Sequence, residues 1–164
     1  MDANISLSSR IAAAIFLLGL YLVCAPPSAQ SSELSSLAGT WTGSGTIALS
    51  DGSIERLRCR ATYRVDGSET GLQQSLRCAS DSYKFDLSSD LVNQGGRISG
   101  AWRESSRGIN GSLEGRVGGG HITASVEGAG FSANIRVTTV GQNQSVSIVS
   151  QGDIRQVSIS MVRR

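Results

Sequence analysis

From about Gly39 to the C-terminus, the sequence consists of short stretches in which apolar and polar residues alternate, separated by glycine-rich turns. Alternation with a period of two places every second side chain on the same face of a β-strand. The stretches that show it are residues 40–49, 54–65, 72–78, 83–91, 98–103, 109–117, 122–127, 131–139, 146–149 and 154–162. Because short turns join them, the pattern predicts an all-β fold, a single-domain antiparallel meander of about eight to ten strands.

One face of the predicted sheet is apolar. Its inward side chains are expected to be Trp41, Tyr63, Phe85, Trp102, Leu113, Val126, Phe131, Ile135, Ile148 and Ile159. Without helices to cover that face, the sheet must close on itself, so we expect a β-barrel over residues 39–164. Five glycines also take inward positions: Gly43, Gly45, Gly100, Gly111 and Gly115. They either let the strands coil and approach closely or leave room for a ligand, and the sequence leaves both readings open.

Two turns predict how the first three strands pair. Folding the chain about residues 66–71 places Val65 opposite Leu72 and Cys59 opposite Cys78, on the apolar face. We therefore expect a disulfide between these cysteines, and two thiols alone cannot complete a zinc site. A three-residue loop at 51–53 is predicted to place Trp41 opposite Tyr63.

The first 29 residues have the order of an export signal. A charged start is followed by an apolar run from Ile11 to Cys24 and by small residues up to Ala29. This order predicts a signal peptide over residues 1–29, cleaved after Ala29, and a periplasmic or extracellular protein. The run is shorter than the roughly 20 residues of a membrane span, so no transmembrane segment is expected in the mature protein. Lipidation of Cys24 stays open, because Val23 stands where a lipobox has a small residue.

Residues 30–38 are expected to be a flexible lead-in or a single helical turn. Directly after them, Leu37-Ala-Gly39-Thr-Trp41 resembles the Gly-x-Trp signature of the calycins, which include the lipocalins and avidin-like barrels. The resemblance implies a small ligand-binding barrel in which the tryptophan closes one end and meets an arginine from near the last strand, here Arg163 or Arg164. The chain also resembles bacterial metalloproteinase inhibitors of calycin-like fold and small secreted proteins of alphaproteobacteria.

Groups suited to catalysis are few. His121, the sole histidine, is expected to point outward, and no Gly-x-Ser-x-Gly elbow occurs. The carboxylates Glu104, Glu114, Glu127 and Asp153 are assigned to polar faces or turns, where they are solvated. We therefore expect no enzyme, no cofactor and no metal site. A formal net charge of +2 without a basic tail argues against a nucleic-acid partner.

An arginine-rich outer face is the strongest polar feature. Its members are Arg56, Arg58, Arg60, Arg64 and Arg77. The predicted register sets Arg77 opposite Arg60, and like charges in that position destabilise a sheet unless an anion or a carboxylate relieves them. The residues predicted opposite the arginines of the second strand are Ala48, Thr46, Ser44 and Thr40, none of them acidic. Asp86 is the nearest carboxylate that could relieve them, and water could do so as well. This face is therefore either an ordinary solvated exterior of the barrel or a candidate anion-binding surface.

Three hypotheses of function follow. The first is an exported, non-enzymatic binding module that holds a small hydrophobic ligand inside the barrel, lined by Trp41, Tyr63, Phe85 and Trp102, or an anionic glycan or lipid of the envelope on the arginines. The second is a protease inhibitor that uses residues 30–37. The third is a structural protein of the envelope.

Overall fold

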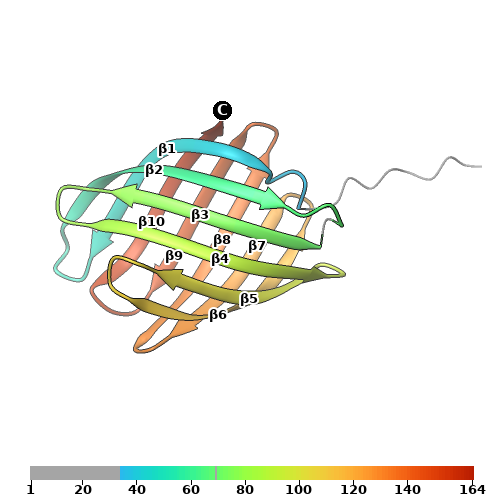
Figure 1. Cartoon of the computed structure of the whole chain (residues 1–164). Helices are drawn as coiled ribbons and strands as arrows, with labels where there is room; N and C mark the ends of the chain where they lie inside the picture. Colours follow the sequence, from blue (N-terminus) through green and yellow to red (C-terminus); the bar gives the residue numbers. More distant parts are fainter. Residues whose placement is uncertain (1–33, 69) are drawn as a thin grey trace, which may run out of the picture.

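The computed structural model describes residues 34–68 and 70–164, which form a closed antiparallel barrel of ten strands (Figure 1). The strands are β1 (Gly39–Leu49), β2 (Ile54–Val65), β3 (Gly71–Ala79), β4 (Lys84–Gln94), β5 (Arg97–Glu104), β6 (Ile109–Gly118), β7 (His121–Gly128), β8 (Phe131–Val140), β9 (Asn143–Ser150) and β10 (Ile154–Arg163). Each strand pairs with its neighbours in the chain, and β1 pairs with β10 to close the ring. The predicted all-β meander barrel is thus confirmed.

The β2–β3 hairpin has the predicted register. Val65 lies opposite Leu72, and Cys59 lies opposite Cys78. The two cysteines form a disulfide, with their Cα atoms 4.2 Å apart. Both are buried on the inner side of the barrel, so the bond ties β2 to β3 within the core.

The β1–β2 register differs from the predicted one by two residues. Trp41 lies opposite Ala61, and Tyr63 lies opposite Gly39. Residues 50–53 separate the two strands, and Leu49 N donates a hydrogen bond to Ser53 O (2.9 Å), so the chain turns one residue earlier than expected, with Gly52 in the left-handed conformation (φ 86°). A shift of two residues keeps every side chain on its predicted face.

The β8–β9 turn is shorter than expected. The predicted strands 131–139 and 146–149 leave residues 140–145 for the connection, whereas Val140 lies opposite Asn143, which leaves two residues in the turn. Gln144 therefore belongs to β9, and it is buried.

The inward glycines mark close approaches between strands. A Cβ on Gly45 would overlap the carbonyl oxygen of Ser158 on β10, and one on Gly100 would overlap that of Asp90 on β4. Gly43, Gly111 and Gly115 would meet neighbouring strands in the same way. None of the five lines the cavity described below, so the close-approach reading is the one that the structure favours.

A short turn closes one end of the barrel. Residues 34–37 are joined by a hydrogen bond from Leu37 N to Leu34 O (2.9 Å), and both leucines are buried. The Trp41 indole beside them is fully buried and donates a hydrogen bond to Leu37 O (2.8 Å). The Arg163 guanidinium lies 4.7 Å from the Trp41 ring centre, and it also donates to the Ser36 carbonyl. The tryptophan–arginine contact implied by the calycin resemblance is therefore present, with Arg163 in that place.

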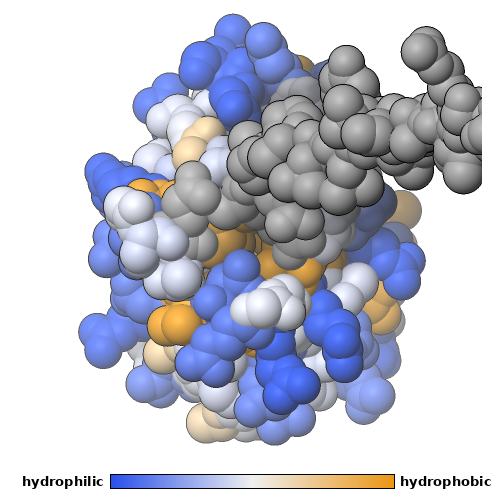
Figure 2. Space-filling model, turned by 90° about the vertical axis from the view of Figure 1, so that its right-hand side faces the viewer, coloured by the Kyte–Doolittle hydropathy of each residue, from blue (hydrophilic) through white to orange (hydrophobic). Residues whose placement is uncertain are grey.

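The exposed positions of the strands are mainly occupied by polar residues. Figure 2, which faces the right-hand side of Figure 1, shows a largely hydrophilic surface with hydrophobic residues gathered toward its middle. Residues 34–68 and 70–164 include no helix with the length and hydropathy of a membrane span. The predicted signal peptide, its cleavage site and Cys24 lie outside the described residues.

Candidate functional site

A cavity of about 430 Å³ lies inside the barrel. It reaches the turns at the end opposite Trp41, where Tyr83, Arg107, Gly130 and Asp153 belong to its lining. We call this end the mouth. The lining is mostly apolar, and its volume is within the range of small-molecule sites in proteins. Its other lining residues are Leu57, Gln74, Leu76, Cys78, Phe85, Leu87, Ser88, Ser89, Trp102, Glu104, Ile109, Leu113, Val126, Phe131, Ile135, Ile148, Ser150, Gln151, Gly152, Ile154, Val157 and Ile159.

Aromatic side chains form two parts of the cavity wall. Tyr83 and Phe85 stack, with ring centres 6.1 Å apart and planes at 7°. Phe131 meets Trp102 edge to face at 5.8 Å. The Trp102 indole nitrogen donates to the carbonyl oxygens of Ser112 (3.0 Å) and Glu127 (3.2 Å), which fixes the ring against the β6 and β7 backbones. The rings therefore present rigid apolar surface to the cavity.

A buried polar network lies near the closed end. The Tyr63 hydroxyl donates to Gln144 Oε1 (3.1 Å), and Gln144 Nε2 donates to Thr139 Oγ1 (3.1 Å). Burial raises the pKa of Tyr63 to about 12, because the phenolate would lose its hydration. The phenol thus stays neutral, and it ties β2 to β9 and β8 across the barrel.

The turn from β5 to β6 is held by Glu104. Its carboxylate is only 4% exposed, and it accepts backbone N–H bonds from Asp86 (3.0 Å), Ser106 (3.0 Å) and Arg107 (2.8 Å). Burial by itself would raise the pKa of Glu104, but the hydrogen bonds outweigh it and lower the pKa below its usual value. Glu104 therefore remains ionised, and it fixes the turn that carries Arg107.

A second carboxylate holds the turn from β3 to β4. Glu55 Oε2 accepts a hydrogen bond from Ser82 N (3.1 Å), and Tyr83 N donates to Ser80 Oγ (3.0 Å). Hydrogen bonds from the hydroxyls of Ser80 and Ser82 lower the pKa of Glu55. Two carboxylates on different strands thus position the turns on this side of the mouth.

The four aromatic residues expected to face a ligand fall into two groups. Phe85 and Trp102 line the cavity, whereas Trp41 and Tyr63 lie in the packed layers at the closed end. Their inward orientation is as predicted. Their positions along the barrel axis differ, so Phe85 and Trp102 can contact a ligand, whereas Trp41 and Tyr63 close the end of the barrel.

The arginine-rich face lies on the outside of β2 and β3. Arg60 is opposite Arg77, as predicted, and Arg77 Nε contacts Asp86 Oδ2 at 3.1 Å. The predicted partners of these arginines on β1 are wrong by two residues. The residues observed opposite Arg56, Arg58 and Arg60 are Thr46, Ser44 and Thr42, respectively. Arg64 lies beyond the paired part of β1. A shallow groove runs between Arg58, Arg60, Arg77 and Lys84.

Sequence reasoning missed the polar groups at the mouth. Glu104 was assigned to a polar face or turn, which is wrong, because it is 3% exposed and lines the cavity. Its spacing of two residues from the inward Trp102 is a signal that could have placed it on the inner side. Arg107 and Tyr83 lie in or beside turns, where alternation gives no orientation. His121 is exposed, as predicted, with Nδ1 3.1 Å from Thr138 Oγ1.

No known protein family and no curated protein matches the sequence. Solved structures that share the fold include the following three. Rv2717c from M. tuberculosis is 16% identical with a TM-score of 0.62, over 80% of this chain and 94% of that chain. The S-type phycobiliprotein lyase CPES from Guillardia theta is 11% identical with a TM-score of 0.57, over 80% of this chain and 90% of that one.

The third structure is a protein of unknown function from Nostoc punctiforme. It is 12% identical with a TM-score of 0.53, over 80% of this chain and 48% of the other. At these identities the likeness concerns the fold alone. The chain thus shares the β-barrel fold of these structures.

The likeness corrects one expectation. We excluded an enzyme because no familiar catalytic motif occurs, yet one protein with this barrel is named a phycobiliprotein lyase. The exclusion was wrong, because the motifs it used belong to other folds, and fold and motif absence do not decide function.

Proposed function

We propose that the barrel binds a small, largely apolar molecule in its cavity. The observation that carries this proposal is a cavity of about 430 Å³ with a mostly apolar lining in a barrel that is closed at the other end. Small barrels are ordinarily filled by their own side chains, so a cavity of this size requires an explanation. Burial of an apolar ligand against the aromatic and aliphatic lining would supply the binding free energy.

The proposal includes export. The Cys59–Cys78 disulfide supports an oxidising compartment, where such bonds persist. The order of residues in the N-terminal segment supports a signal peptide. A periplasmic or extracellular carrier accounts for both the disulfide and this segment. N-terminal sequencing of the protein secreted by its native host tests the cleavage after Ala29.

Neighbouring residues on β9 provide a matched pair of variants. Ile148 lines the cavity, whereas Val149 is 53% exposed on the outer face. Ile148→Trp fills the cavity, and Val149→Trp adds the same side chain outside. Solvent extraction of the native protein identifies co-purified apolar molecules, and isothermal titration with a panel of hydrophobes measures affinity.

We expect Ile148→Trp to weaken binding roughly tenfold or more, because the ligand must give up buried contact area, and Val149→Trp to leave binding unchanged. Thermal melts establish that both variants fold. An empty extract together with no heat of binding from any hydrophobe would refute the proposal, as would equal affinities of folded Ile148→Trp and the native protein.

A second candidate function is the binding of an anionic envelope component by the arginine-rich face. The like-charged pair Arg60 and Arg77, of which Arg77 contacts the carboxylate of Asp86, supports it. Sedimentation with vesicles that contain phosphatidylglycerol, against phosphatidylcholine alone, measures it. Loss of sedimentation in Arg60→Gln/Arg77→Gln but not in the charge-matched Arg116→Gln/Arg136→Gln is the expected result, and equal loss in both would count against a specific face.

The inhibitor and structural hypotheses stay predictions. In the described part of the proposed inhibitory segment, Leu34 and Leu37 pack into the closed end of the barrel. This contact gives the segment a role in closing the barrel and provides no support for insertion into a protease cleft.

A further inference from the structure

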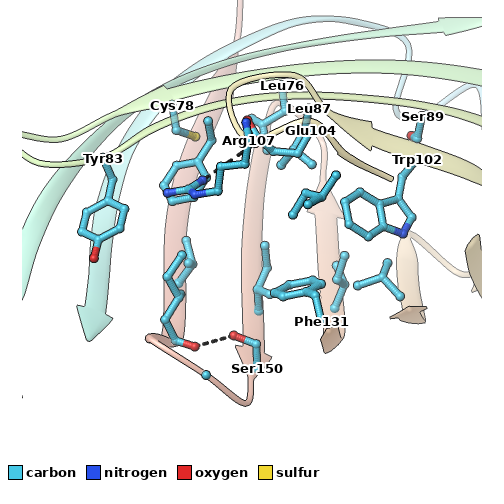
Figure 3. Close-up of a pocket in the computed structure, with 18 of the residues that line it drawn as sticks. Leu76, Cys78, Tyr83, Leu87, Ser89, Trp102, Glu104, Arg107, Phe131 and Ser150 are labelled. Carbon is cyan, nitrogen blue, oxygen red and sulfur yellow. Dashed lines mark hydrogen bonds and ion pairs between the residues drawn. The ribbon is translucent and has the colours of Figure 1, made fainter. Parts of the chain in front are cut away.

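A cationic side chain reaches into the mouth of the cavity. Arg107 belongs to the turn from β5 to β6, and Figure 3 shows its side chain directed toward the cavity near Tyr83. Its guanidinium carbon lies 5.6 Å from the ring centre of Tyr83 and 5.0 Å from that of Phe85. These contacts hold the guanidinium by cation–π attraction, so its position does not depend on a ligand.

The donors of this guanidinium are not taken up by acceptors in the described part of the protein. An arginine has five N–H donors. Arg107 Nη1 forms a long ion pair with Glu104 Oε2 at 3.9 Å, which is beyond hydrogen-bond distance. Among the described residues the guanidinium donates no hydrogen bond, and the side chain is 39% exposed. Because these N–H groups lie at the rim of an apolar cavity, they favour a ligand that carries a hydrogen-bond acceptor.

The acidic groups near Arg107 do not occupy the same place. Glu104 is the ion-pair partner of Arg107, but its oxygens already accept three backbone N–H bonds and its side chain is only 4% exposed, so it leaves the outer side of the guanidinium open to a ligand. Asp153 also lines the mouth, but on the turn between β9 and β10, four strands away around the barrel. It is exposed to water, where salt screens its charge.

We infer that the molecule bound in the cavity is an amphiphile, whose anionic head, a carboxylate or a phosphate monoester, is held by Arg107 at the mouth while its apolar tail fills the barrel. The inference rests on the proposed function, since it names the ligand class of that cavity. A guanidinium suits both heads because its planar fork pairs with two oxygens at once.

Three probes with the same tail separate the head from the tail. Dodecanoate, dodecyl phosphate and dodecanol are titrated into the native protein at low and high salt. We expect at least one anionic probe to bind roughly tenfold tighter than dodecanol, because a hydrogen bond to a charged group adds to burial of the tail. Added salt weakens the anionic probes and leaves dodecanol unchanged. The stronger anionic probe identifies the head.

Variants assign the effect to one side chain. Arg107→Gln is expected to reduce the affinity of the anionic probe to that of dodecanol, with dodecanol binding retained. Arg107→Lys keeps the charge but loses the fork, so an intermediate affinity is expected. Arg103→Gln, an exposed arginine on the outer side of β5, is the matched control and should change nothing. Asp153→Asn should leave anion binding equal or slightly tighter.

The outcomes distinguish the two levels of the proposal. Equal affinities of the anionic probes and dodecanol in the native protein, with no effect of salt, would overturn the anionic-head inference and leave the proposed cavity function standing. Failure of all three probes to bind would overturn both. The salt series needs no variant, so the test holds even if a substitution at Arg107 unfolds the turn.

Discussion

Loss of the Cys59–Cys78 bond should lower the free energy of unfolding by roughly 3 kcal/mol. The two cysteines are 19 residues apart in the chain, and the bond removes the entropy that the open loop between them has in the unfolded state. For a barrel of this size, that loss corresponds to a fall in Tm of roughly 10 °C. Both cysteines are buried, so the two thiols of the reduced protein lie within the core.

Urea unfolding of the native protein with and without reductant measures the effect. The oxidised and reduced forms share every heavy atom, so their difference reports the cross-link. We expect a lower midpoint in the reduced form and a larger slope of free energy against urea, because an unfolded chain without the cross-link exposes more surface. Alkylation and mass spectrometry establish which form is present.

A double variant, Cys59→Ala/Cys78→Ala, provides an independent measurement. It removes the bond together with two sulfur atoms from the core, so it should be at least as destabilising as reduction. Coincident urea midpoints of the oxidised and fully reduced protein would refute the chain-entropy argument for this hairpin.

Three further predictions concern single residues. Gly100→Ala should cost about 1–3 kcal/mol or more in urea unfolding, because its Cβ would overlap the β4 backbone, whereas Gly67→Ala, which meets nothing within 4 Å, should be near neutral. The raised pKa of Tyr63 means that its contribution to stability is complete below its ordinary pKa of 10.0 and is lost as pH rises toward about 12; stability curves of native protein and Tyr63→Phe should converge there. The lowered pKa of Glu104 has the opposite sign: its contribution is present above its ordinary pKa of 4.5 and is lost as pH falls below it, so Glu104→Gln should remove part of the acid sensitivity. A pH profile unchanged by either substitution would contradict the corresponding assignment.

Alternation was sufficient to predict the strands and the disulfide. A period of two assigns each side chain to a face without any knowledge of its partner. The turn at residues 66–71 then fixes which residues face each other, so the pairing of Cys59 with Cys78 follows from local sequence alone. The register was predicted wrongly where a glycine determines the position of the turn, as at Gly52. Alternation cannot distinguish two registers that differ by two residues, because both place each side chain on the same face.

The cavity could not be predicted in the same way. Alternation places Trp41 and Trp102 on the inner face alike, yet one closes the barrel and the other lines the cavity. The difference lies in their height along the barrel axis, which depends on the accumulated stagger of all ten strands. A sequence read one hairpin at a time contains no direct measure of that stagger.

The mouth follows from a different kind of contact. Glu104 points inward because it lies two residues after Trp102 on the same strand. It is kept ionised by backbone N–H groups of the following turn, whose conformation the alternation does not predict. That same turn directs Arg107 over two aromatic rings from β4 and the turn before it. The strands therefore form the apolar wall of the cavity, and a turn supplies Arg107 at its rim. Among the described lining residues, Arg107 is the single exposed cation. Because an apolar interior gives a tail no orientation, a head bound at the rim determines which end of a ligand enters first.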